Sequence, residues 1–365
     1  MTTVARPVET RPKRAEVAAL DAFCRAVLLA VGADEPTADA ATRAMMHGSR
    51  LGIDSHGVRL LDHYEVVLAK GRVKPQPEMQ LVGGYGAVAV LDADHGHGAL
   101  ATYRAMDHAV RLAQTLGVSA VGIRNSSHFG PAGAYALAAA DAGCMGIVTC
   151  NADSFVRLHD GAVRFHGTNP IACAVPVAGG RPWLLDMATS ALTYNRVQLY
   201  KSLGATLPPA VASTENGEDT DNPAQVEMLA PLGGAFGFKG AGLAGFAEIL
   251  SAVLTGMRLS FDIAPMAGPD LSTPRAMGAF VLAIRPDAFV DVETFEDGMR
   301  RYLDRLRSSP PRTGAAVLAP GDREWAEAER RDREGVPIDF ATQATFERLA
   351  MKYSIELPFS ERADA

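Results

Sequence analysis

The sequence predicts a mixed α/β protein with helical units near both ends of the chain. Between residues 76 and 307, apolar runs typical of strands alternate with runs of helical periodicity, which is the pattern of an α/β body. Before residue 75, apolar residues recur only at helical spacing. Helical patterns return after residue 320, and we expect them to pack against the N-terminal helices.

Three helices are expected within the first 75 residues, at residues 15–31, 36–49 and 56–70. The first rests on apolar residues at helical spacing, namely Val17, Leu20, Cys24, Val27 and Val31. The third is expected to end at Gly71, with Pro75 shortly after it. Residues 1–13 carry charge and proline without an apolar run, and we expect a disordered arm there.

The rest of the chain is expected to alternate strands and helices. Strands are expected at residues 87–94, 118–124, 145–151, 171–177, 182–188 and 278–284. Helices are expected at residues 99–116, 133–143, 238–257, 292–307, 322–335 and 342–355. The segment 213–223 is acidic and rich in turn residues, so it is expected to be a loop.

The composition is that of a globular protein with two or three lobes. The 365 residues carry a net charge of −7, which argues against a broad surface for nucleic acid or an acidic membrane, although a local basic patch is compatible with it. No window approaches about 18 uncharged apolar residues, and the N-terminus has no secretory signal segment. We therefore expect a cytoplasmic protein without a membrane span. The cysteines are interpreted as reduced core residues rather than disulfides or metal ligands: Cys24, Cys144, Cys150 and Cys173.

The segment GIDSHGVRLLDHY, residues 52–64, gathers polar side chains at an expected helix start. If Ser55 is the N-cap, His56 lies in a first turn whose free N–H groups and positive dipole end favour an anion. Arg59 then projects on the same face and suits a carboxylate, while His56 can exchange a proton near neutral pH. A plain capped helix with solvated side chains explains the motif too, and the motif alone slightly favours that interpretation.

Other segments carry weaker signals. RNSSHFGPAGAYAL, residues 124–137, places His128 and Gly130 in a strand-to-helix loop, where α/β proteins bind ligands and a helix start offers N–H groups to a phosphate. Alone, His128 is more simply a surface residue. GTNP (167–170) and DMATS (186–190) are explained by turns and strand ends. PLGGAFGFKGAG (231–242) surrounds Lys239 with glycine and suits phosphate binding, but it is neither a P-loop nor a Rossmann GxGxxG after a strand.

Taken together, these segments resemble one known family. DSHGVRLL, NSSHFG, GTNPIA, DMATS and KGAGLAGFAEIL stand in the order and spacing of the malate/L-lactate dehydrogenase family, over about residues 15–350. This non-Rossmann family includes ureidoglycolate, sulfolactate, diketogulonate and Δ1-piperideine-2-carboxylate enzymes. The resemblance implies a mixed α/β fold of the family's own type and a dimeric NAD(P)-dependent oxidoreductase, with NAD placed slightly ahead of NADP. The substrate is expected to be a small anionic 2-hydroxy, 2-oxo, amino or imino acid.

The resemblance also implies roles for individual residues. His56 matches the proton donor or acceptor, supported by Ser55, and His128 matches the base proposed in the ureidoglycolate branch. Arg59 corresponds to an arginine that binds the substrate carboxylate, although several members have it one residue later. Thr168 matches a substrate contact. The implied cofactor contacts are His128, Phe129, Gly130, Asp186, Met187, Ala188, Lys239, Gly240, Pro320 and Gly321.

Arg196 stands at the position that separates the branches of the family. Cyclic imine reductases carry an aspartate relay there, whereas hydroxy-acid members usually carry lysine. A permanent cation cannot act as that relay, but it favours an anionic substrate or lowers the pKa of a nearby histidine. We therefore expect a hydroxy-acid dehydrogenase ahead of an imine reductase. A cofactor-binding protein without turnover is the alternative from another class, and no metal site is expected.

The resemblance suggests three domains. Residues 14–75 with 322–358 are expected to form a helical dimerisation domain. Residues 76–122 with 230–321 are expected to form a central α/β domain, and residues 123–229 a cofactor-binding α/β domain.

Overall fold

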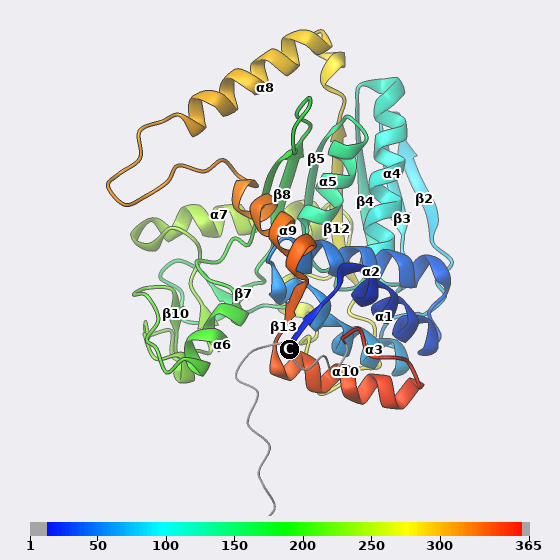
Figure 1. Cartoon of the computed structure of the whole chain (residues 1–365), viewed down its shortest axis with the longest axis vertical. Helices are drawn as coiled ribbons and strands as arrows, with labels where there is room; N and C mark the ends of the chain where they lie inside the picture. Colours follow the sequence, from blue (N-terminus) through cyan, green and yellow to red (C-terminus); the bar gives the residue numbers. More distant parts are fainter. Residues whose placement is uncertain (1–12, 360–365) are drawn as a thin grey trace, which may run out of the picture.

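The computed structural model describes residues 13–359 (Figure 1). Residues 1–12 of the expected arm lie outside the described residues, whereas Lys13 belongs to a strand. This strand, β1 (Lys13–Ala15), pairs antiparallel with β13 (Val336–Ile338). The pairing joins the beginning of the described chain to its C-terminal part.

The expected N-terminal helical unit is present and the C-terminal helices pack against it. It comprises α1 (Val17–Ala30), α2 (Glu35–Arg50), α3 (Leu61–Ala69), α9 (Asp322–Glu334) and α10 (Phe340–Tyr353). Asp34 caps α2 by accepting a hydrogen bond of 2.9 Å from the Thr37 N–H. The Phe23 ring of α1 lies 4.9 Å from the Phe346 ring of α10. The expected return of the C-terminal helices is therefore confirmed.

A seven-stranded mixed sheet forms the body of the protein. Its strand order is β2-β3-β4-β12-β5-β8-β9. The strands are β2 (Gln80–Tyr85), β3 (Val88–Asp92), β4 (Val118–Ser126), β5 (Met145–Cys150), β8 (Ile171–Val175), β9 (Trp183–Met187) and β12 (Met277–Ile284). Only β3 and β4 pair in parallel, across the crossover helix α4 (Gly98–Leu116); the other pairs are antiparallel. This is a mixed α/β fold and not a doubly wound parallel sheet.

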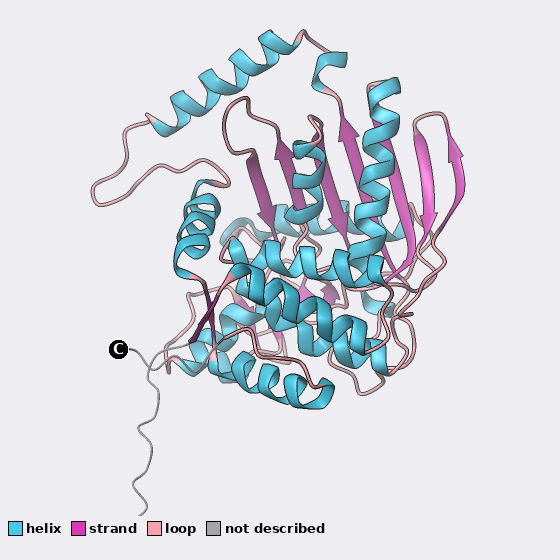
Figure 2. Ribbon diagram, turned by 45° about the vertical axis from the view of Figure 1, so that its right-hand side comes forward, coloured by secondary structure: helices cyan, strands magenta, loops and turns pink. Residues whose placement is uncertain are grey.

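Helices lie on both faces of this sheet (Figure 2). One face is covered by α4 and α5 (Gly133–Asp141). The other is contacted by α7 (Gly237–Glu248) and the π-helical turn Ile249–Val253 that continues it. The expected domain boundary at residue 122 requires correction, because it falls inside β4 and the sheet runs from β3 to β9 without interruption. Backbone pairing across β4, β12 and β5 makes this one structural unit.

A smaller unit lies beside the main sheet. Its four strands, in the order β10-β11-β6-β7, are β10 (Ala212–Ser213), β11 (Met228–Leu229), β6 (Val156–Arg157) and β7 (Arg164–His166). Helix α6 (Tyr194–Ser202) packs on it through the fully buried Val197. Short 3-10 turns complete the chain at Asp54–His56, Val58–Leu60, Pro223–Gln225, Gly234–Phe236, Ser260–Asp262 and Pro286–Ala288.

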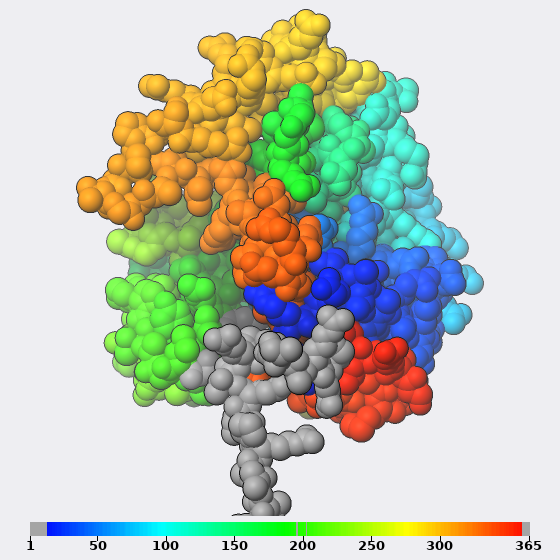
Figure 3. All heavy atoms as spheres, viewed as in Figure 1, coloured from blue at the N-terminus to red at the C-terminus, as the bar shows by residue number. Residues whose placement is uncertain are grey.

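Helix α8 (Val292–Arg307) lies along one edge of the molecule, and the chain then projects as a loop before α9 (Figure 3). Its bounds agree with those expected from the sequence. Asp291 caps it by accepting a 2.8 Å hydrogen bond from Thr294 N–H. Leu303 is the one residue of α8 that is buried, so this helix contributes little to the core.

One described segment, Gly234–Val253, is long and apolar enough to cross a membrane by length and composition, a weak indication that core helices of soluble proteins also give. This segment contains Lys239 and Glu248. Glu248 is 7% exposed and accepts hydrogen bonds from Asn169 Nδ2 at 2.6 Å and Ser260 N at 2.7 Å. Because a buried carboxylate needs such partners, this face of the segment is built into the interior of the protein.

Candidate active site

The third expected helix begins later than the sequence suggested. Residues 54–56 and 58–60 form two 3-10 turns, and α3 starts at Leu61. Gly57 separates the turns with an extended backbone, φ −92° and ψ −151°, which an α-helix cannot contain. The expectation that Ser55 caps an anion-binding helix start is therefore wrong. No side-chain hydrogen bond caps α3.

Close packing against α2 produces the break at Gly57. A Cβ added to Gly57 would lie 2.3 Å from Ser49 Oγ, and one added to Gly48 would lie 2.5 Å from the His56 carbonyl oxygen. Ser49 Oγ in turn accepts a 2.9 Å hydrogen bond from Val58 N–H. Two glycines thus let the backbone carrying His56 lie directly on α2, a tertiary constraint that helical periodicity does not reveal.

Two histidines from distant motifs face each other at the centre of the site. Their rings are stacked with centroids 6.0 Å apart and planes at 16°. Ser55 Oγ lies 2.9 Å from His56 Nδ1, and the Tyr64 phenol oxygen lies 3.0 Å from His128 Nδ1. Each imidazole therefore has a hydroxyl at hydrogen-bonding distance from its Nδ1, which holds the ring in place through that nitrogen. Tyr64 had no assigned role in the sequence, although it lies in the same segment as His56.

Two more histidines surround this pair. The His63 ring on α3 lies 6.2 Å from the His128 ring, edge to face. His97 is fully buried, lies edge-on to Tyr64 at 4.2 Å, and caps α4 by accepting a hydrogen bond from Ala99 N–H at 3.1 Å. Among the described residues no three His, Cys, Asp or Glu side chains are placed to hold a metal ion.

Burial keeps these imidazoles neutral. It lowers the pKa of His56 and of His63 to about 4 and that of His97 to about 3. The pKa of His128 lies well below its ordinary value, first because of burial and then because His56, His63, Arg275 and His97 are close to it. A neutral imidazole has one N–H donor and one bare nitrogen acceptor. Near pH 7 each histidine can therefore donate one hydrogen bond and accept one.

Asp186 lies at the start of α5, next to the loop that carries His128. Its Oδ2 accepts a 2.8 Å hydrogen bond from Gly133 N–H, and a Cβ on Gly133 would lie 2.8 Å from that oxygen. The expectation that α5 offers its N-terminus to a phosphate is corrected, because the protein's own carboxylate occupies it. Burial raises the pKa of Asp186 to about 6. The neighbouring Met187 and Ala188 are half-buried.

The loop between β4 and α5 is packed against its surroundings at Phe129 and Gly130. Phe129 is 3% exposed, and its carbonyl oxygen accepts a hydrogen bond from the Tyr135 hydroxyl. Gly130 has a φ of +78°, where L side chains are strained. A Cβ there would lie 3.4 Å from the Tyr64 hydroxyl. The SHFG motif therefore packs directly against the tyrosine that contacts His128.

A second group of expected residues meets beyond the end of β9. Thr189 N–H donates to the Thr168 carbonyl oxygen at 3.0 Å, and Leu232 N–H donates to the Thr189 carbonyl oxygen at 2.9 Å. Gly240 packs so closely on Leu232 that a Cβ would lie 2.1 Å from its carbonyl oxygen. These contacts join the GTNP, DMATS and PLGG segments. Residues 240–245 do have GxGxxG spacing, but they lie inside α7 and form no strand-to-helix turn.

Lys239 is exposed at the start of α7. Its ammonium lies 5.3 Å from the centre of the Phe236 ring, and within residues 13–359 it has no ion-pair partner. Helix α7 has no side-chain cap. An exposed ammonium group beside helix N–H groups that no side chain caps is suited to an anionic ligand.

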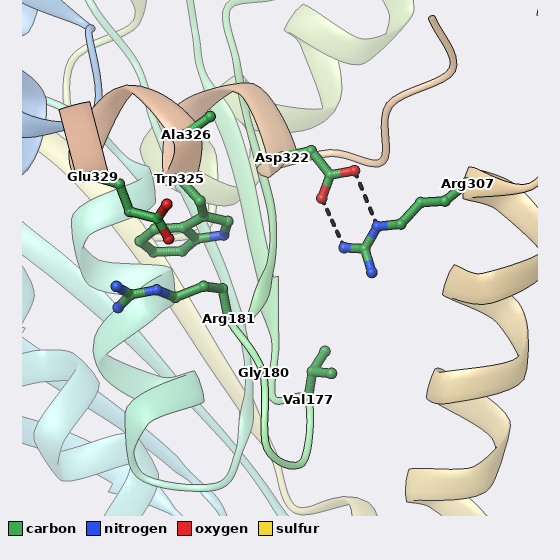
Figure 4. A pocket seen from close by; sticks show the side chains of 8 residues that line it. All are labelled: Val177, Gly180, Arg181, Arg307, Asp322, Trp325, Ala326 and Glu329. Carbon is green, nitrogen blue, oxygen red and sulfur yellow. Dashed lines mark hydrogen bonds and ion pairs between the residues drawn. The ribbon is translucent and has the colours of Figure 1, made fainter.

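Pro320 and Gly321 pack against β9. They directly precede Asp322, which lines a pocket of about 320 Å³ (Figure 4). Leu184 N–H donates to the Pro320 carbonyl oxygen at 3.2 Å. In the pocket the Arg181 guanidinium lies 5.5 Å from the centre of the Trp325 ring. The pocket is lined by Val177, Gly180, Arg181, Arg307, Asp322, Trp325, Ala326 and Glu329.

The two arginines expected to bind substrate are on the surface. Arg59 is exposed in the 58–60 turn and Arg196 is exposed on α6. In the described part of the chain neither has an ion pair. A third arginine, Arg275, was not expected; it is 2% exposed, pairs with Asp153, and lowers the pKa of His63 and of His128. It stands 85 residues beyond Ser190, the end of DMATS, in no recognisable motif, so no sequence signal marked it.

Comparison with known proteins agrees with this fold. Residues 15–347 match the family described as malate/L-lactate dehydrogenase. The chain is 32% identical to malate dehydrogenase of Pyrococcus abyssi, covering 87% of this chain and 89% of that protein. It is 31% identical to ureidoglycolate dehydrogenase (NAD(+)) of Escherichia coli, covering 80% and 83%.

Solved structures show the same likeness. Malate dehydrogenase of Entamoeba histolytica superimposes with a TM-score of 0.90 at 28% identity, covering 96% of this chain and 100% of that one. Δ1-piperideine-2-carboxylate reductase of Pseudomonas syringae superimposes with a TM-score of 0.83 at 27% identity, covering 93% and 100%.

The fold and these likenesses define the class of the protein: it is an NAD(P)-dependent dehydrogenase. Within that class, the chain belongs to the malate/L-lactate dehydrogenase family. The alternative of a cofactor-binding protein without turnover is therefore set aside.

Proposed function

We propose that the enzyme interconverts a small 2-hydroxy acid, of the malate, lactate or ureidoglycolate type, and its 2-oxo acid. When bound, the nicotinamide supplies the hydride chemistry at substrate C2. The observation that carries the proposal is the stacked pair of His56 and His128, each held by a hydroxyl on Nδ1. Two such imidazoles can form hydrogen bonds with the oxygen of a C2 hydroxyl or carbonyl group and exchange a proton with it.

In this mechanism the protein orients the substrate and moves one proton. His56, backed by Ser55, takes the hydroxyl proton in oxidation and returns it in reduction, with His128 as the alternative for that role. The His128 ring is surrounded by the rings of His56, His63 and Tyr64, and hydrogen bonds in such a partly buried place are stronger than in water. Orientation combined with acid–base help is sufficient, because the cofactor carries the redox chemistry.

The carboxylate contacts are proposed to be Arg59, Thr168 and Arg196. Arg59 and Arg196 are exposed, which leaves both guanidiniums available to an anion. Arg275 is a third cation whose charge already acts on the histidines. It lies deeper than the other two and is paired with Asp153, so we propose that it attracts the carboxylate by charge rather than by a direct contact.

The residues present fit a nicotinamide dinucleotide, and we propose NAD ahead of NADP. Lys239 and the uncapped start of α7 suit a pyrophosphate, with Gly240 allowing close backbone packing there. The remaining proposed contacts are His128, Phe129, Gly130, Asp186, Met187, Ala188, Pro320 and Gly321. The pocket beside Gly321 contains two arginines and two acidic residues, so it has no surplus positive charge for the extra phosphate of NADP.

The direct test is oxidation of NADH and of NADPH with a panel of 2-oxo acids and cyclic imines. We expect turnover of at least one 2-oxo acid, faster with NADH. Turnover of imines alone would replace the proposal with a cyclic imine reductase. A His56→Ala variant that keeps full kcat would transfer the acid–base role to His128.

The imine alternative is supported by the likeness to the Pseudomonas syringae reductase. Against it stands Arg196, which occupies the position that the resemblance assigns to an aspartate in the imine reductases. An arginine stays protonated at all relevant pH values, so it cannot pass a proton along such a relay. The substrate panel separates the two functions directly.

We further propose a cytoplasmic homodimer. One side of α7 and its π-helical turn is exposed and apolar, and monomeric proteins rarely leave such a surface uncovered; its residues are Phe238, Leu243, Phe246, Ile249, Val253 and Leu254. Light scattering should give twice the mass of one chain. Phe246→Asp should shift the equilibrium to monomers, whereas a Tyr302→Asp control on α8 should not.

A further inference from the structure

The contact between Tyr64 and His128 has a defined direction. Tyr64 is 2% exposed, and its phenol oxygen lies 3.0 Å from His128 Nδ1. Within residues 13–359 this is the one hydrogen bond of the Tyr64 hydroxyl. Burial also raises the pKa of Tyr64, so the hydroxyl keeps its proton.

A buried O–H group with one available partner donates to it. If His128 carried its proton on Nδ1, that N–H would donate to the phenol oxygen and leave the phenol proton unpaired in the interior. An unsatisfied buried donor costs about 1–3 kcal/mol. The phenol therefore donates to Nδ1, and the proton of the neutral His128 ring stands on Nε2.

The contact between Ser55 and His56 joins two half-buried residues. A serine oxygen has two acceptor lone pairs, so it can accept a hydrogen bond from Nδ1–H of a neutral or a protonated His56 ring. This is the property required of an imidazole that gains and loses a proton in each turnover.

We propose that Tyr64 is a positioning residue that holds His128 as its Nε2–H tautomer, so that His56 alone exchanges the proton with the substrate. This inference rests on the proposed function. In oxidation, the C2 hydroxyl proton passes to Nε2 of His56; a bound nicotinamide would take up the C2 hydride, which leaves C2=O. His128 donates a hydrogen bond from Nε2 to the same oxygen in both directions, as a neutral electrophile.

The groups around His128 support this division of roles. His56 faces it from the 54–56 turn, His63 from α3, His97 from the start of α4, and Arg275 from the segment before β12. Protonation of His128 would place a second positive charge near Arg275 in a buried site. His128 thus donates its hydrogen bond without becoming a cation.

The tautomer can be observed without turnover. Two-dimensional NMR of protein labelled with ¹⁵N-histidine resolves protonated and bare ring nitrogens, and the nine histidines limit overlap. The His128 signals are assigned as those lost in His128→Gln. We expect a bare Nδ1 and a protonated Nε2 in the wild type, and a mixture of tautomers in Tyr64→Phe. Tyr103→Phe, a buried tyrosine of α4 without a histidine contact, should leave the His128 signals unchanged. A protonated Nδ1 in the wild type overturns the proposal.

Kinetics separate the two histidines. Glutamine retains an N–H donor close to the position of Nε2 but cannot exchange a proton, so His128→Gln should retain part of kcat together with the wild-type pH dependence. His56→Gln should lose about 10²–10⁴-fold in kcat and lose that pH dependence. The reverse pattern assigns the proton to His128 and overturns the proposal. If the wild type turns over none of the panel, the proposed function fails, while the NMR result still decides whether Tyr64 sets the tautomer.

Discussion

The buried guanidinium of Arg331, on α9, binds the carboxylate of Asp54, two residues before His56. Its Nη2 lies 3.0 Å from Asp54 Oδ2, and its Nη1 lies 2.6 Å from the Ser49 carbonyl oxygen at the end of α2. Arg331 is 5% exposed. A residue near the C-terminus thus fixes the turn that carries the proposed acid–base histidine.

We expect Asp54→Asn to lower activity and stability together. Loss of this charged hydrogen bond should reduce the free energy of unfolding by about 1–3 kcal/mol and reduce kcat several-fold, because the His56 turn loosens. Asp332→Asn is the matched control: Asp332 also belongs to α9 and its carboxylate pairs with Arg50 of α2, but both partners are about 40% exposed. Urea unfolding and steady-state rates of both variants test this. Equal effects of the two substitutions would contradict the role of Arg331.

Gly48→Ala should impair the enzyme although alanine favours helices. A Cβ at Gly48 would lie 2.5 Å from the His56 carbonyl oxygen, so α2 and the 54–56 turn must separate. Gly298→Ala provides the opposite case, because Gly298 is exposed inside α8 with nothing within 4 Å of an added Cβ. That control should gain about 0.5–1 kcal/mol. Calorimetry should therefore show a lower Tm for Gly48→Ala and a higher Tm for Gly298→Ala. We expect kcat to fall only in Gly48→Ala.

Local patterns were sufficient for most of the fold. Helix α8 was expected at 292–307 and has those bounds, since its apolar spacing and the Asp291 cap are adjacent in the sequence. The strands of the central sheet were expected for the same reason, but β2 was missed. All six of its residues are exposed, so it lacks the alternation by which a half-buried strand is recognised.

The site was predictable only in part. His56 and His128 were identified from separate motifs, but their stacking and the Tyr64 contact join residues 64 or more positions apart. Periodicity within one segment contains no information on such contacts. The late start of α3 has the same cause, because packing of Gly57 on Ser49 overrides the local helical preference.

The protein should lose stability as the pH falls from about 6.5 to about 4. Four histidines have a lowered pKa in the folded state, to about 4 or about 3: His47, His56, His63 and His97. The unfolded chain binds protons at these groups near pH 6.5, whereas the folded chain does not. Unfolding is then favoured by up to about 1.4 kcal/mol per pH unit for each group. Asp186 opposes this trend, because its raised pKa of about 6 makes the folded state bind a proton first.

Urea titrations at several pH values measure how steeply the free energy of unfolding changes with pH. His47 lies outside the proposed substrate contacts, so His47→Gln should reduce the slope between pH 6.5 and 4 with little effect on kcat. A stability that stays constant over this range would show that the histidines are more accessible to protons than their burial implies.

Arg275 should contribute more than Arg59 to binding of the substrate carboxylate. Removing Arg275 alone leaves Asp153 unpaired, so the informative variant is Arg275→Met with Asp153→Asn, which removes both charges of the pair. We expect KM for the 2-oxo acid to rise about tenfold or more, with a smaller change in kcat. The pKa of His128 should rise, because the nearby positive charge no longer opposes protonation. For His63 the simultaneous loss of Asp153, which raises its pKa, offsets part of the same effect.

Arg59→Ala is the comparison that decides which cation holds the substrate. Arg59 is exposed and without an ion pair among residues 13–359, and an exposed charge interaction contributes about 0–1 kcal/mol. This limits its expected effect on KM to about fivefold. A larger rise in KM for Arg59→Ala than for the double variant would mean that the 58–60 turn rearranges when substrate binds and brings Arg59 into the site. The carboxylate would then be held from the surface, and the charge of Arg275 would serve mainly to keep His128 neutral.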